Sequence, residues 1–108
     1  MPMVSVIMPV FNAGDGSELE QAIQSILQQT FVDFELIICD DASTDNTWEH
    51  LQKWATMDSR IVLLQNAVNQ KAGAARNCCI NQSQGRFIAF MDADDISAPN
   101  RLQTQLEF

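Results

Sequence analysis

Short, nearly continuous apolar runs alternate along this chain with segments in which apolar and polar residues recur at helical spacing. The runs are Val4–Val10, Phe34–Asp40, Ile61–Leu64 and Phe87–Met91, and most of their residues are β-branched or otherwise apolar. Runs of this length and composition are typical of strands that are buried on both faces of a parallel sheet. The pattern therefore predicts a buried strand at each run.

The intervening segments predict helices, because apolar residues recur there at the spacing that gives a helix one apolar face. The predicted helices are Ser17–Gln29, a second with Trp48, Leu51, Trp54 and Ala55 on its apolar face, Lys71–Gln84, and Pro99–Phe108. We expect Gly85 to close the third helix in the left-handed conformation, which glycine adopts at low cost.

Strands that alternate with helices predict an α/β fold, here a Rossmann-like three-layer α/β/α sandwich with a mainly parallel sheet. Right-handed crossovers place the carboxyl ends of parallel strands at one edge, where ligand sites of open α/β sheets lie. That edge should collect Pro9–Asn12, Asp40 with Asp41, and Asp92–Asp95. Because the chain stops inside its last predicted helix, we expect a truncated piece of a longer protein, with apolar surface exposed at the severed edge.

Composition narrows the classes of function. The chain has 108 residues and a formal net charge of −8, from 14 acidic and 6 basic residues, without a basic patch. This balance argues against binding to nucleic acids or anionic membranes. The three cysteines form no CxxC pair, so we expect reduced, buried thiols and a cytoplasmic protein. The first residues resemble neither a signal peptide nor a membrane span, so membrane association would have to come through the missing C-terminal part.

Carboxylates follow the last predicted strand at Asp92, Asp94 and Asp95. One interpretation is a solvated acidic turn before a helix, because aspartate is common in turns and at helix N-termini. Against it, neighbouring carboxylates repel each other unless a cation or strong hydrogen-bond donors lie between them. Oxygen ligands select hard ions such as Mg²⁺ or Mn²⁺, and a site with few carboxylates leaves coordination positions for phosphate oxygens.

The second predicted strand ends in Asp40 and Asp41, which also allow two interpretations. They could belong to a turn in which Ser43 and Asp45 cap the next helix, an interpretation that we weigh for Asp40 in particular. Asp41 would instead point into the crevice at the sheet edge, where its carboxylate could accept a hydrogen bond from an N–H group of a ligand.

Phe11 and Arg76 are ambiguous in the same way. Phe11 is either a core or rim residue or a ring on which a base stacks. Arg76 is either a surface cation or a group that pairs with Asp41 or contacts the ligand. We assign no function to His50, the only histidine. The absence of Ser-His-Asp, Cys-His and GxGxxG arrangements excludes hydrolase triads and dinucleotide-binding folds.

Several strings occur together in a fixed order: Val4–Asn12, Ser25–Thr30, Phe34–Thr47, Ala75–Asn77 and Gly85–Asp95. In this order and spacing, the chain resembles the family 2 glycosyltransferases of the GT-A fold over nearly its whole length. The resemblance implies a site for a nucleotide-diphosphate sugar. The nucleotide-binding residues carried over by position are Pro9, Val10, Phe11, Asn12, Asp41, Arg76, Asp92 and Ala93, and the metal ligand, for Mn²⁺ or Mg²⁺, is Asp94.

Each of these positions has a role in the resemblance. The ring of Phe11 would stack on the base, Asp41 would accept from it, and Arg76 would lie near the base side of the pocket. Asp92 would lie on the ribose side. Asp94 would hold the metal, which neutralises the diphosphate while the sugar departs.

The resemblance also implies a reaction. A sugar, carried by UDP in the expectation that the resemblance supports, would pass to a hydroxyl of a saccharide, lipid-linked or protein acceptor, with inversion and with help from the metal. Residues 1–108 would form the donor-binding part, and the acceptor half would be absent. The general base would lie beyond Phe108, so no catalytic residue is named, and this segment alone should bind weakly and transfer nothing.

The chain departs from the family pattern at two places near the third predicted helix. The family often has Asn-x-Gly where this chain has Asn69-Gln70-Lys71, and glycine where Cys79 stands.

One alternative function is that of a non-catalytic, glycosyltransferase-like nucleotide-binding domain. The other is a receiver-type signalling module, although a receiver carries its acid pair after the first strand, whereas here acids follow the second and fourth predicted strands.

Overall fold

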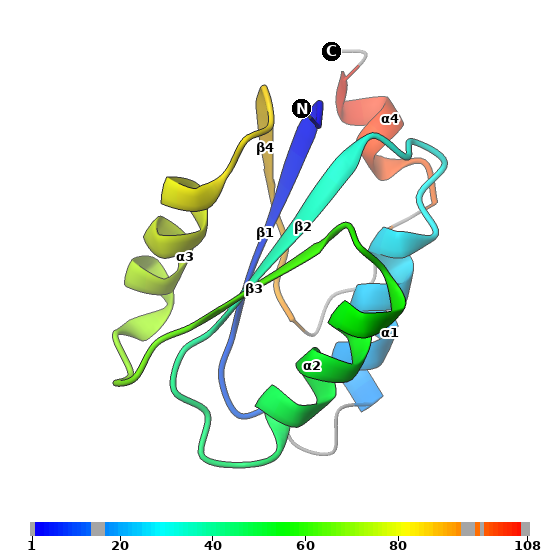
Figure 1. Cartoon of the computed structure of the whole chain (residues 1–108). Coiled ribbons are helices and arrows are strands. Elements are labelled where there is room, and N and C mark those ends of the chain that lie inside the picture. The colour runs from blue at the N-terminus through cyan, green and yellow to red at the C-terminus, as the bar shows by residue number, and fades with distance from the viewer. Residues whose placement is uncertain (1, 14–16, 94–96, 98, 107–108) are drawn as a thin grey trace.

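Parallel strands and their connecting helices form three layers in the computed structural model (Figure 1). The structure describes residues 2–13, 17–93, 97 and 99–106. The strands are β1 (Val4–Val10), β2 (Phe34–Asp40), β3 (Ile61–Gln65) and β4 (Phe87–Phe90), and the helices are α1 (Ser17–Leu27), α2 (Thr47–Met57), α3 (Lys71–Gln82) and α4 (Arg101–Leu106). The strand order is β3-β2-β1-β4, and every pairing is parallel.

Alternate side chains of β1 face two different cores. Val6 and Met8 pack with residues of α1, α2 and α4 in the larger core. Ile7 packs with Ala75 and Cys79 of α3 in a smaller core on the other face. Because side chains of a strand alternate between faces, a strand as apolar as β1 needs helices on both sides. Figure 1 shows α3 alone on one side of the sheet, and the predicted three-layer sandwich is confirmed.

The predicted thiol state agrees with the structure for the buried cysteines. Cys39 and Cys79 are both buried in the smaller core, and Cys78 is half-buried beside it. All of them are free. None of the helices in the described ranges is long and apolar enough to cross a membrane.

The boundaries of β1 and β2 agree with the prediction, but the end of the third helix does not. α3 ends at Gln82, and Ser83 is already extended, with φ −69° and ψ 141°. The prediction that Gly85 closes this helix is therefore wrong. Gly85 is instead required by close packing, because a Cβ atom there would lie 2.5 Å from the backbone nitrogen of Ser5 in β1. Its own N–H donates to Ser5 Oγ at 2.8 Å.

The edge strand β4 carries exposed apolar side chains. Phe87, Ile88 and Phe90 are 54%, 41% and 49% exposed, and β4 pairs only with β1 in the described sheet. Arg101 donates from Nη2 to the carbonyl oxygen of Phe90 at 2.5 Å. β4 thus presents apolar surface at an edge of the sheet.

Arg60 connects the turn after α2 to the neighbouring elements. Its Nε and Nη2 atoms donate to Asp58 at 3.0 and 2.8 Å, and Nη2 also donates to the carbonyl oxygen of Leu27 at 3.2 Å. The guanidinium lies 4.4 Å from the centroid of the Phe34 ring. The hydrogen bonds from Arg60 lower the pKa of the Asp58 carboxyl below its usual value.

This lowered pKa predicts a loss of stability in acid. The contribution of Asp58 is fully present above the pKa of the unfolded chain, about 3.9, and is lost as the pH falls through the lower pKa of the folded state. Because the pair is partly solvated, we expect at most about 1 kcal/mol. Urea unfolding at pH 6 and pH 2.5 should show that Asp58→Asn costs stability at the higher pH and much less at the lower one. An equal cost at both pH values would contradict the role of the ionised pair.

Candidate functional site

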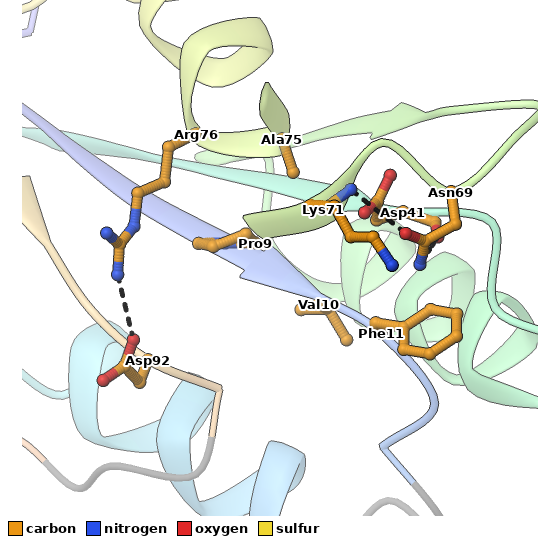
Figure 2. Close-up of a pocket in the computed structure, with 9 residues that line it drawn as sticks. All are labelled: Pro9, Val10, Phe11, Asp41, Asn69, Lys71, Ala75, Arg76 and Asp92. Carbon is orange, nitrogen blue, oxygen red and sulfur yellow. Dashed lines mark hydrogen bonds and ion pairs between the residues drawn. The ribbon is translucent and has the colours of Figure 1, made fainter. Parts of the chain in front are cut away.

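A pocket of about 320 Å³ lies at the carboxyl edge of the sheet. Figure 2 shows its lining, which comes from the end of β1, the turn after β2, the start of α3 and the segment after β4. The lining residues are Pro9, Val10, Phe11, Asp41, Asn69, Lys71, Ala75, Arg76 and Asp92. The parallel topology thus brings together residues that are distant in the sequence, as predicted for this edge.

Phe11 leaves the sheet directly after β1. Phe11 is 51% exposed, so it is not a core residue, and its ring stands at one end of the pocket (Figure 2). A rim residue and a stacking surface for a base both fit this position. The next residue, Asn12, has a left-handed φ of 47°. Its N–H donates to Ser43 Oγ at 2.9 Å, and its Oδ1 accepts from the N–H of Thr44 at 2.8 Å. These bonds hold the turn after β1 against the turn after β2.

Asp41 is a buried carboxylate that the protein holds in place from one side. Its Oδ1 accepts from Asn66 Nδ2 and from the Gln70 N–H, each at 2.9 Å. Asn69 Nδ2 donates to its backbone carbonyl oxygen at 3.2 Å. The Asp41 N–H donates to the carbonyl oxygen of Val10 at 2.8 Å. Asp41 takes part in none of the ion pairs between described residues, and its held carboxyl group offers the pocket a hydrogen-bond acceptor.

Asp40 has a structural role, as the turn interpretation predicts. It is completely buried, and its Oδ1 accepts from both the N–H and the Oγ of Ser43. Asp45 accepts from the N–H of Thr47 at 3.0 Å at the start of α2. Asp40 is not part of the pocket lining.

Arg76 and Asp92 form an ion pair at the end of the pocket opposite Phe11 (Figure 2). Arg76 Nη2 lies 3.4 Å from Asp92 Oδ1, and both side chains are exposed. The guanidinium also lies 5.9 Å from the centroid of the Phe90 ring. Arg76 therefore pairs with Asp92 and not with Asp41, and it lies away from Phe11, not on the Phe11 side of the pocket that the resemblance implies. An exposed pair of this length is weak and can exchange for a ligand at small cost.

The other predicted residues lie beside the pocket or outside the described ranges. Asn12 is next to Phe11 but is not in the lining, and Ala93 packs partly buried against the larger core. Asp94 and Asp95 lie outside the described residues. Among the described residues, no group of three or more His, Cys, Asp or Glu side chains is arranged to hold a metal ion. Asp92 contributes one carboxylate at the pocket edge, an oxygen donor of the kind that Mg²⁺ and Mn²⁺ prefer.

Sequence reasoning missed the loop that holds Asp41. Asn66, Asn69 and Gln70 donate to it, and Lys71 lines the pocket next to them. These contacts join the ends of β2 and β3 to the start of α3, so no local pattern predicts them. The departure at Asn69-Gln70-Lys71 from the expected Asn-x-Gly was the one signal in the sequence that pointed to this loop.

The chain is similar to known proteins over nearly its whole length. Residues 5–108 match the family model described as glycosyl transferase family 2. Escherichia coli WfaP, a UDP-Glc:α-D-GlcNAc-diphosphoundecaprenol β-1,3-glucosyltransferase, is 39% identical over 108 residues, which are 100% of this chain and 41% of WfaP. The chain thus spans less than half of this relative.

Two solved structures show the same arrangement of elements. The crystal structure of Staphylococcus aureus TarS 1–349 in complex with UDP has a TM-score of 0.88 at 28% identity, over 99% of this chain and 31% of TarS. The mannosyltransferase PcManGT from Pyrobaculum calidifontis, in complex with GDP-Man and Mn²⁺, has a TM-score of 0.89 at 24% identity, over 98% of this chain and 32% of that enzyme.

Proposed function

The chain belongs to glycosyl transferase family 2 and has the GT-A type of fold, and from this premise we propose that it is the donor-binding part of an enzyme that transfers a sugar from a nucleotide diphosphate to a hydroxyl acceptor. One observation carries the proposal. An exposed aromatic ring, Phe11, and a fixed buried carboxylate, Asp41, line the same pocket, and the Arg76–Asp92 pair lies at its other end. This order of groups suits a base, then a ribose, then a diphosphate.

At the base end, the ring of Phe11 would stack on the base, and the Asp41 carboxylate would accept a hydrogen bond from it. The ring offers a π-face to a base, and stacking of a base on an aromatic side chain is worth about 1–3 kcal/mol. Asp41 Oδ1 is already held by Asn66 and Gln70, which orients the carboxylate without a ligand. A preorganised acceptor loses little entropy when the base binds.

At the other end, the proposal assigns the ribose to Asp92, with Ala93 beside it, and a metal to Asp94. A divalent Mn²⁺ or Mg²⁺ would neutralise the diphosphate and stabilise the charge that grows on it as the sugar leaves. Asp92 offers an exposed carboxylate to the ribose hydroxyls, and Arg76 can release it to approach the ligand. Pro9 and Val10 supply the floor between the two ends.

Relatives that are longer than this chain support a proposal for the wider role. We propose a UDP-linked donor, because WfaP is named for UDP-Glc and TarS was solved with UDP. We propose a saccharide acceptor in the synthesis of a cell-envelope polysaccharide, inversion at the transferred sugar, and a cytoplasmic site of action, which the free cysteines support. The acceptor half and the general base would come from sequence beyond Phe108, packed against the apolar edge strand β4.

Phe11→Ala should lower the affinity of the full-length protein for UDP about tenfold, because it removes the stacking surface. Met57→Ala is the control, since Met57 is an exposed apolar residue of α2, outside this pocket and away from the edge strand β4. Isothermal titration calorimetry with UDP measures both. Equal UDP affinity of Phe11→Ala and the wild type would remove Phe11 from the site.

The metal is tested separately. Calorimetry should show that UDP binds more tightly with Mn²⁺ than with EDTA, and that Asp94→Asn weakens binding in Mn²⁺ at least about tenfold, or about 1.4 kcal/mol. In EDTA the variant and the wild type should bind UDP alike. The metal assignment is wrong if the wild type binds UDP equally well with Mn²⁺ and with EDTA.

A further inference from the structure

Lys71 combines a strained backbone with a side chain in the pocket. It begins α3 with φ 72°, in the left-handed region where residues with a Cβ atom are disfavoured. It lines the pocket, and Figure 2 shows its side chain extending from the start of α3 toward Phe11, alongside Asn69. Glycine would adopt this backbone at lower cost, so a lysine here points to a use for its side chain.

The loop before α3 fixes both Lys71 and Asp41. Asn69 Oδ1 accepts from the Lys71 N–H at 3.0 Å, and the neighbouring Gln70 N–H donates to Asp41 Oδ1 at 2.9 Å. The position of the lysine is therefore tied to that of the carboxylate. The two charged groups line the same pocket without an ion pair between them, since their charged atoms do not come within 4.0 Å.

The charges of the pocket leave the Lys71 ammonium available. Two carboxylates, Asp41 and Asp92, and two cations, Arg76 and Lys71, line it. Arg76 pairs with Asp92, whereas Lys71 makes no ion pair with a residue in the described ranges. An ammonium group donates only, so it selects an acceptor atom on the ligand.

We infer that Lys71 and Asp41 together recognise the edge of a base in which a ring N–H adjoins a carbonyl group. This inference rests on the proposed function. In uracil, Asp41 accepts from N3–H, and Lys71 donates to the carbonyl oxygen at position 4. Cytosine presents the reverse pattern, with an unprotonated N3 facing the carboxylate and an amino group facing the ammonium. Lys71 is thereby a specificity-determining residue that favours uracil over cytosine nucleotides.

The test compares UDP with CDP. Calorimetry on the full-length wild type, Lys71→Gly and Lys71→Arg measures both affinities, and thermal unfolding checks the fold. Lys71→Gly should raise the Tm, because glycine suits the left-handed backbone. It should also lower the ratio of UDP to CDP affinity about tenfold, the effect of one charge-assisted hydrogen bond. Lys71→Arg keeps a cationic donor and should retain most of the ratio.

The outcomes separate this inference from the proposed function. If Lys71→Gly leaves the ratio of UDP to CDP affinity unchanged, the inference is overturned. This holds even if the affinities for UDP and CDP fall together, because an ammonium that contacts phosphate affects the two nucleotides equally. In that case UDP binding by the wild type still supports the proposed function. Absence of UDP binding by the wild type overturns the proposed function, and this inference with it.

Discussion

Asp41→Asn is expected to lower the affinity of the full-length protein for UDP about a hundredfold, or about 2.7 kcal/mol, with little change in stability. Asparagine keeps an Oδ1 that can accept from Asn66 Nδ2 and the Gln70 N–H, which hold Asp41 in the native protein. In place of the second carboxylate oxygen it presents an NH₂ group. That donor would face the N3–H donor of uracil, so one hydrogen bond is lost and two donors oppose each other.

Asp41→Ala is the companion variant, and it separates binding from folding. Alanine leaves the Gln70 N–H and Asn66 Nδ2 without their acceptor, so it should also cost about 1–3 kcal/mol of stability. Urea unfolding measures that cost, and calorimetry measures UDP and CDP affinity. Asp41→Asn should lose less affinity for CDP than for UDP, because its NH₂ group can donate to N3 of cytosine. A stable Asp41→Asn protein with native UDP affinity would contradict the role of Asp41 as base acceptor.

Gly85→Ala is expected to destabilise the protein by about 3 kcal/mol. The new Cβ atom would lie 2.5 Å from the backbone nitrogen of Ser5 and 2.7 Å from the carbonyl carbon of Val4. Both atoms belong to β1, which pairs with β4 through Val4 opposite Phe87 and Ser5 opposite Ile88. Neither backbone atom can move without disturbing that pairing, and β4 leads into Asp92.

Gly73→Ala is the matched control. Gly73 lies inside α3, and a Cβ atom there would meet nothing within 4 Å. This substitution should stabilise the protein by about 0.5–1 kcal/mol, because alanine is a better helix former than glycine. Urea unfolding should therefore show a lower free energy of unfolding for Gly85→Ala and a higher one for Gly73→Ala. Native stability of Gly85→Ala would show that the β1–β4 contact yields more easily than its geometry indicates.

The strands could be predicted from the sequence because their composition reflects their burial. β1 and β2 are buried on both faces, so nearly every residue is apolar, and their predicted bounds match the structure. The edge strand β4 ends one residue earlier than predicted, at Phe90. Helix ends were less predictable. The sequence indicated that Gly85 ends a helix, but glycine is required there because a Cβ atom would be too close to Ser5, which is distant in the sequence.

The site could be predicted in outline for a related reason. Parallel topology alone places Phe11, Asp41 and Asp92 at one edge, and these residues do line one pocket. The partners of each side chain could not be predicted, because they depend on loop conformations. Arg76 binds Asp92 and not Asp41, and the loop of Asn69 and Lys71 closes around Asp41 through contacts between separate elements.

A crystal structure of the full-length protein with UDP and Mn²⁺ would show whether this pocket holds the nucleotide of a sugar donor. We predict a uracil ring stacked on Phe11, with N3 within hydrogen-bond distance of the Asp41 carboxylate and the diphosphate directed toward Asp92. UDP bound elsewhere, with Phe11 and Asp41 free of the base, would contradict the account.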